Sequence, residues 1–189
     1  MNRRSALYVT LAIVVVAIAA AIYFARRPST ISPLATQTAA PVAPKIAVGG
    51  RAPEFQALTT QGLFDLNKTK KPVFLEVFAT WCPHCQRETA VIDELYRANL
   101  GKVAFVAVSG SNVGIDGQTP ETAADVLRFA QQFHVKYPVA YDGELTVANR
   151  YLQGGFPTIV IIDRSKHITY VNSGEVPADQ LNAELQKVL

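Results

Sequence analysis

An almost unbroken apolar run extends from Val73 to Ala79, interrupted only by Glu76. A run of this kind, without polar alternation, predicts a β-strand that is buried on both faces of a sheet. Helix-forming residues follow from about Cys82 to Asn99, and Gly101 lies just beyond them as a stop signal. The chain is therefore expected to pass from a buried strand almost directly into a long helix.

Strands and helices alternate along the rest of the chain. Further strands are expected at Phe55–Leu58, Leu63–Leu66, Val103–Ser109, Val139–Tyr141, Thr158–Asp163 and His167–Asn172. Helices are expected at Pro120–Phe133 with Thr119 as N-cap, at Glu144–Tyr151 as a helical turn, and at about Ala178–Leu189. This interleaving predicts an α/β fold, with a mixed β-sheet and helices on both of its faces.

The N-terminal segment from Ser5 to Ala25 is 21 residues long and carries no charge. As a helix it would span roughly 31 Å, close to the ~30 Å hydrocarbon core of a bilayer. Arg26 and Arg27 follow it, as is typical of residues at a membrane interface. We therefore predict an uncleaved transmembrane anchor in residues 1–27. A cleaved signal peptide is the alternative, because small-x-small sites lie within the apolar run.

Composition changes sharply after this segment. Residues 28–45 contain four prolines and one charge, which is typical of a semi-extended linker, and residues 46–189 are long enough to form one domain with its own core. All 15 acidic residues lie after Val48, so the net charge of +3 comes from the N-terminal part of the chain. Because the basic residues flank an apolar segment and do not stripe a folded face, nucleic-acid binding is excluded.

The chain has two cysteines, Cys82 and Cys85, at the junction between the buried strand and the long helix. A zinc site would need two further ligands, and His134 and His167 lack ligand-like spacing. A structural disulfide closing so small a loop would add little stability. At a helix N-terminus the backbone N–H groups and the helix dipole favour a thiolate, which is the attacking species in disulfide exchange. The pair therefore indicates reversible dithiol–disulfide chemistry without a metal.

Three segments resemble the TlpA/ResA branch of the thioredoxin superfamily. They are Arg51-Ala52-Pro53-Glu54-Phe55, the run from Pro72 to Cys85, and Gly155-Phe156-Pro157-Thr158 with Ile162-Asp163. The resemblance implies a thioredoxin-like fold after one transmembrane helix, with the catalytic domain on the periplasmic side of the cell membrane. It further implies a disulfide reductase that needs no cofactor, takes electrons from a membrane donor and acts on disulfide-bearing envelope proteins, including apocytochromes c.

Three other functions remain open. The dipeptide Pro83-His84 between the cysteines is similar instead to that of disulfide-forming oxidases, which leaves the direction of electron flow undecided. A copper-binding assembly chaperone of similar fold would need wider cysteine spacing and a paired histidine. A thiol peroxidase is a weaker alternative.

Five neighbours of the cysteines are expected to act with them. His84 is expected to stabilise the thiolate of Cys82, with Trp81 and Pro83 also tuning the pair. The resemblance implies that Pro157 is a cis proline facing the cysteines and that Phe156 offers backbone groups to an extended substrate segment.

Two acids are candidate proton acceptors for the cysteines. Glu76 occupies the position of the buried acid of thioredoxin, and burial in a central strand would raise its pKa so that it could shuttle a proton. A side chain reaching out at the sheet edge is the alternative. Glu88 shares a helix face with Cys85 and resembles an acid of ResA-type proteins, although an acid near a helix N-terminus also stabilises the helix by itself.

Overall fold

The computed structural model describes Tyr23 and residues 46–189. The predicted anchor and linker, residues 1–27 and 28–45, lie outside the described residues except for Tyr23. In the part of the chain that is described, no helix is both long enough and apolar enough to cross a membrane.

Strand β3 (Val73–Phe78) lies in the middle of a seven-stranded mixed sheet with the order β2-β1-β5-β4-β3-β6-β7. The other strands are β1 (Gln56–Thr59), β2 (Gly62–Asp65), β4 (Ala104–Ser109), β5 (Val139–Tyr141), β6 (Thr158–Ile162) and β7 (Ile168–Ser173). Strands β3, β4 and β5 run parallel, whereas β6 pairs with β3 and β7 in antiparallel fashion. β3 has a partner on both edges and a core on both faces, and all six of its residues are buried.

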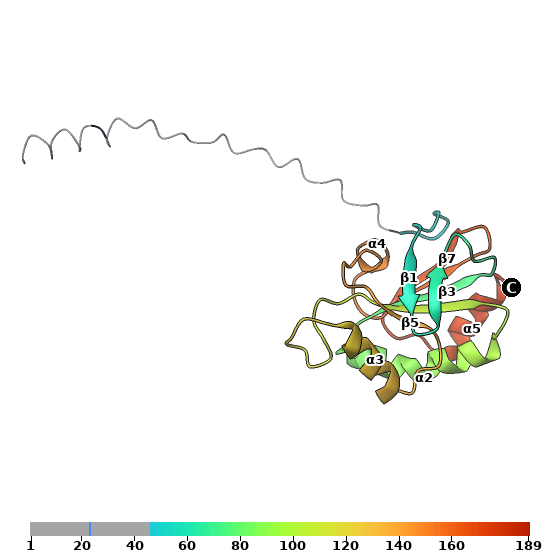
Figure 1. Cartoon of the computed structure of the whole chain (residues 1–189). Helices are drawn as coiled ribbons and strands as arrows, with labels where there is room; N and C mark the ends of the chain where they lie inside the picture. The colour runs from blue at the N-terminus through green and yellow to red at the C-terminus, as the bar shows by residue number, and fades with distance from the viewer. Residues whose placement is uncertain (1–22, 24–45) are drawn as a thin grey trace, which may run out of the picture. The chain divides into compact units, whose positions relative to one another are not determined.

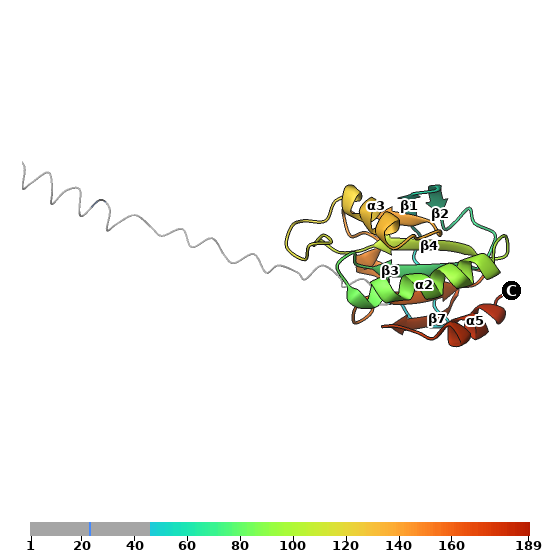
Figure 2. The same ribbon diagram turned by 90° about the horizontal axis from the view of Figure 1, so that it is seen from below.

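Four helices cover the sheet, namely α2 (Pro83–Ala98), α3 (Ala123–Gln132), α4 (Ala148–Tyr151) and α5 (Ala178–Gln186). Figure 1 shows α2, α3 and α5 on one side of the sheet and the short α4 on the other side. In the view of Figure 2, α2 crosses the sheet in front of β3. The mixed sheet with helices on both faces therefore agrees with the fold class predicted from the sequence.

The side chains of β3 alternate between two cores, as the period of a strand requires. Phe74 and Phe78 pack into the core beneath α2, α3 and α5, whereas Val73, Leu75 and Val77 pack into the core beneath α4. Alternation therefore places the side chain of residue 76 on the α2 face of the sheet. This is the face that also holds the cysteines.

The predicted start of α3 was wrong. The sequence placed the helix start at Pro120 with Thr119 as N-cap, but α3 begins at Ala123 and its N-cap is Thr122. Thr122 and Asp125 form a reciprocal capping box, which satisfies two backbone N–H groups of the first turn. Pro120 instead forms a bridge with Val113 at the base of the preceding loop.

Two other helices are shorter than predicted. The turn expected from Glu144 is helical only at Ala148–Tyr151, and the last helix ends at Gln186 before the C-terminal Leu189. The carboxylate of Asp142 accepts the backbone N–H groups of Val147 and Ala148, so it satisfies the start of α4 from outside the helix.

Candidate active site

Cys82 is the N-cap residue of α2, and Pro83 occupies the first turn of that helix. The Cys82 sulfur accepts a hydrogen bond from the backbone N–H of Cys85 at 3.4 Å. Both cysteines are free thiols; Cys82 retains 3% exposure and Cys85 has none. The structure therefore brings the two sulfurs to the start of the helix, where unpaired N–H groups favour negative charge on the first of them.

The loop before β6 lies against this pair. The Phe156–Pro157 peptide bond is cis, as the TlpA/ResA resemblance implied, and the carbonyl oxygen of Phe156 is 3.7 Å from the Cys82 sulfur. The ring of Trp81 meets the Phe156 ring edge-on, with 6.1 Å between the ring centroids. Trp81 remains 39% exposed, so it forms an apolar surface beside the less accessible sulfur.

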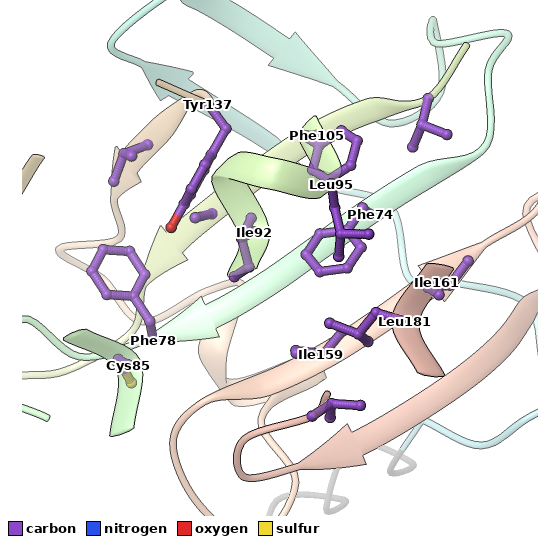
Figure 3. Close-up of a cluster of buried hydrophobic side chains, with 14 of the residues drawn as sticks. Phe74, Phe78, Cys85, Ile92, Leu95, Phe105, Tyr137, Ile159, Ile161 and Leu181 are labelled. Carbon is purple, nitrogen blue, oxygen red and sulfur yellow. The ribbon is translucent and has the colours of Figure 1, made fainter. Parts of the chain in front are cut away.

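Glu76 is buried on the α2 face of the sheet, which excludes the alternative of a side chain at the sheet edge. Burial, together with the neighbouring Glu88 carboxyl, raises the pKa of Glu76 to about 8, and the Tyr137 hydroxyl opposes part of this rise. Neither Glu76 Oε1 nor the Tyr137 hydroxyl lies within hydrogen-bonding distance of a partner among the described residues, so Tyr137 acts on the Glu76 carboxyl from beyond that distance. Figure 3 shows Tyr137 in the same apolar cluster as Phe78 and Cys85. Glu76 is therefore an acid poised near neutral pH in an apolar site.

Burial also raises the pKa of Cys85, and the Glu76 carboxylate and Cys82 raise it further. Cys85 is thus a poor thiolate unless a base takes its proton, and Glu76 is the carboxyl whose charge raises the pKa of Cys85. Glu88 is equally buried, and its Oε1 accepts the backbone N–H of Val176 at 3.2 Å. Burial raises the pKa of Glu88 to about 7, against the opposing effect of that hydrogen bond. Glu88 therefore also ties α2 to the segment before α5.

His84 lies on the surface and contacts two charged residues. Its Nδ1 is 2.5 Å from Oε1 of Glu175 and 2.8 Å from Nη2 of Arg87. Arg87 also donates to Glu175 from Nε at 3.1 Å and from Nη2 at 2.5 Å. His134 and His167 take no part in this site, and no metal-binding group of three His, Cys, Asp or Glu side chains occurs in the described part of the chain.

Glu121 is a third buried acid, and it was missed by the sequence reasoning. Its carboxylate accepts hydrogen bonds of 2.7 Å from the hydroxyls of Thr80 and Ser109, both fully buried. Burial raises the pKa of Glu121, although these hydroxyls lower it. The hydroxyl of Ser111 accepts the Trp81 indole N–H at 2.9 Å. The loop after β4 therefore fixes the two residues that immediately precede Cys82.

Replacing Glu121 by alanine should destabilise the fold by about 2–4 kcal/mol, because two buried hydroxyls would each lose their acceptor. Chemical denaturation would measure this loss. Glu144, which is exposed, provides the matched control, and Glu144→Ala should change stability by less than about 0.5 kcal/mol. A Glu121→Ala protein as stable as the control would show that these hydroxyls find other partners.

Comparison with known proteins gives consistent results. The Redoxin family model matches residues 47–189. The chain is 31% identical over 147 residues to the thiol-disulfide oxidoreductase ResA of Bacillus cereus, covering 76% of this chain and 80% of the relative. A ResA of Geobacillus kaustophilus is 30% identical over the same length, covering 76% and 79%.

Several solved structures have folds similar to that of this chain. A putative thiol:disulfide interchange protein DsbE from Chlorobium tepidum has a TM-score of 0.63 and 25% identity, covering 76% of this chain and 99% of that one. A thioredoxin-like protein from Aeropyrum pernix has a TM-score of 0.57 at 20% identity, covering 71% and 89%.

Proposed function

The chain belongs to the Redoxin family, and on this basis we propose that it is a thiol–disulfide oxidoreductase whose redox couple is Cys82 and Cys85. Its substrates are proteins that contain disulfides. The observation that carries the proposal is the pair of free thiols at the start of α2, with the first sulfur accepting a backbone N–H and lying beside the carbonyl of Phe156.

In the proposed reaction, the Cys82 thiolate attacks one sulfur of a substrate disulfide; that S–S bond breaks and a mixed disulfide forms. Cys85 then gives its proton to Glu76 and attacks the Cys82 sulfur, which releases the second substrate thiol. A Cys82–Cys85 disulfide forms, and the substrate gains two electrons and two protons: one that Cys82 lost to solvent on ionising and one that Cys85 passed to Glu76. Glu76 is favoured over Glu88 as the acceptor because the charge of Glu76 is among the causes that raise the pKa of Cys85, whereas that of Glu88 is not.

Substrate docking is proposed to use the cis-proline loop. Phe156 and Trp81 present a ring pair beside the Cys82 sulfur, and the backbone of residues 155–157 lies next to it. An extended substrate segment could pair with this backbone by strand addition. Such pairing would bring a substrate disulfide to Cys82 and leave Cys85 shielded.

We further propose that the direction is reduction, outside the cytoplasm, with electrons from a membrane donor. The ResA relatives and the apolar segment Ser5–Ala25 support this assignment. Apocytochromes c are candidate substrates. The second candidate is a disulfide-forming oxidase, favoured by one specific feature, His84 between the two cysteines.

The reduction potential distinguishes the two directions. A partial positive charge beside the Cys82 sulfur stabilises the reduced form, whereas the buried carboxylates disfavour a second negative charge on sulfur. We expect roughly −250 to −180 mV, between the values of about −270 mV for thioredoxin and about −120 mV for the strongest oxidase. Equilibration with glutathione buffers would give the potential, and thiol trapping in cells should find the pair reduced. A potential near −120 mV with the pair oxidised in growing cells would establish the oxidase instead.

A further inference from the structure

A cluster of three charged or titratable side chains, His84, Arg87 and Glu175, lies directly beside the redox pair. His84 and Arg87 belong to the first turns of α2, whereas Glu175 lies in the segment between β7 and α5. Figure 2 shows the C-terminal end of β7 next to the start of α2. The function proposed above gives His84 a role beside the cysteines, but it gives none to Arg87 or Glu175.

Glu175 is the hub of the cluster. Its Oε1 accepts two hydrogen bonds from the Arg87 guanidinium and lies 2.5 Å from His84 Nδ1. The Arg87 and His84 contacts lower the pKa of Glu175, which is therefore ionised at neutral pH. The side chains are 61%, 57% and 37% exposed for His84, Arg87 and Glu175. Ion pairs this exposed contribute little to folding stability, so a purely structural role does not account for the arrangement.

The cluster acts electrostatically on the attacking sulfur. The pKa of Arg87 is raised, mainly by its hydrogen bond to Glu175 and to a smaller extent by the charge of Cys82. His84 lies between the two cysteines in the sequence, in the first turn of the helix that Cys82 caps. Two cationic or potentially cationic groups at this place would favour the thiolate, and hence the reduced form of the pair. The carboxylate of Glu175 contacts both groups and offsets their charge.

The contacts of His84 Nδ1 also restrain the imidazole ring, whether or not Nδ1 carries a hydrogen. A hydrogen on Nδ1 can be donated to the Glu175 carboxylate, and an Nδ1 without hydrogen can accept from Arg87 Nη2. Arg87 has only donors and the carboxylate has only acceptors, so one of the two bonds is always available. Glu175 and Arg87 together therefore hold His84 to the segment before α5.

We propose that Glu175 is a positioning and charge-compensating residue that lowers the reduction potential of the Cys82–Cys85 couple. It counteracts the oxidising influence of His84 and Arg87 and keeps a chain with a Pro-His dipeptide in the range of a reductant. The proposal rests on the redox function of the cysteines proposed above. It assigns to one surface carboxylate, distant in sequence, control over the preferred direction of electron flow.

The test compares Glu175→Gln, Arg87→Gln and the double variant in the full-length chain, each equilibrated with glutathione buffers. Glu175→Gln removes a negative charge and should shift the equilibrium at least threefold toward the reduced pair, which is about 14 mV at about 30 mV per tenfold. Arg87→Gln removes a positive charge and should shift it in the opposite direction. The double variant should lie between the two. High salt should shrink both shifts, because exposed charges are screened.

The matched control is Glu184→Gln, which removes another ion-paired carboxylate, held by Lys187 at 2.7 Å, from α5. It should leave the equilibrium unchanged. Opposite signs for Glu175→Gln and Arg87→Gln identify a charge effect, because a structural disturbance has no reason to reverse with the sign of the charge removed. Shifts of the same sign, or none beyond the control, would overturn the proposal. A wild-type chain that forms no Cys82–Cys85 disulfide in any buffer would reject the redox function itself, which is a different result.

Discussion

The Cys85→Ser protein is expected to accumulate covalent adducts through Cys82 and to lose turnover completely. Cys82 retains 3% exposure whereas Cys85 is fully buried, so an incoming disulfide reaches Cys82 first. Burial raises the pKa of Cys85, which further disfavours it as the first nucleophile. Attack by Cys82 still forms the mixed disulfide, but a serine cannot resolve it. Non-reducing electrophoresis and intact-protein mass measurement would detect the adducts.

The Cys82→Ser protein is the matched control, because it changes the same atom at the other end of the pair. It should be inactive without trapping partners. If it trapped partners while Cys85→Ser did not, the order of attack would be reversed. The buried position of Cys85 would then have to open before reaction.

The fold was predictable because its strongest signals are local. Strand β3 and helix α2 could each be predicted from the residues within them. The succession of buried strand, cysteine pair and long helix is specific for this fold. The Redoxin match and the thioredoxin-like structures confirm the fold and the TlpA/ResA resemblance. The prediction of where α3 starts was wrong because two threonines, Thr119 and Thr122, are both suitable N-cap residues. The capping box with Asp125 decides between them.

Most of the predicted site residues share the strand and helix that carry the cysteines, and the exception, the cis-proline loop at Phe156 and Pro157, was found through the TlpA/ResA resemblance. Glu76 and Glu88 could be found because strand alternation and helix spacing point both toward the pair. Glu121 and Glu175 could not, because their partners are distant in sequence: those of Glu121 lie 12 and 41 residues away, and His84 lies 91 residues from Glu175. The residues next to Glu175 in the sequence do not indicate that its side chain will contact His84 in the folded protein. Such contacts follow from the packing of α2 against the segment before α5, which sequence patterns do not encode.

Glu76→Gln should slow the resolving step by about 10- to 100-fold near neutral pH, because it removes the carboxylate that takes the proton from Cys85. The pKa of about 8 places this acid near the working pH, where a general base is most effective. Rapid-mixing measurements of mixed-disulfide resolution between pH 6 and 9 would show the effect. An unchanged rate across this range would leave Glu76 with a structural role only.

The same substitution should remove a pH dependence of stability. The pKa of Glu76 rises from its ordinary value of 4.5 to about 8 in the folded protein. Between these values the folded chain keeps a proton that the unfolded chain has lost. The stability that this carboxyl contributes is therefore fully present below pH 4.5 and is lost as the pH rises through 8, at up to about 1.4 kcal/mol per pH unit. Glu76→Gln should thus be more stable than wild type at pH 8, by on the order of a few kcal/mol.

Glu88→Gln separates the two buried acids in this experiment. Cys85 is perturbed by Glu76 and Cys82, so the loss of Glu88 should leave the resolving step fast. Because the Glu88 carboxyl helps to raise the pKa of Glu76, its removal should shift the pH profile of resolution to lower pH. Slow resolution in Glu88→Gln together with normal resolution in Glu76→Gln would transfer the role of proton acceptor to Glu88.

A Glu76→Gln protein that is more stable than wild type but resolves the mixed disulfide more slowly would mean that the chain keeps a destabilising buried acid for its chemistry.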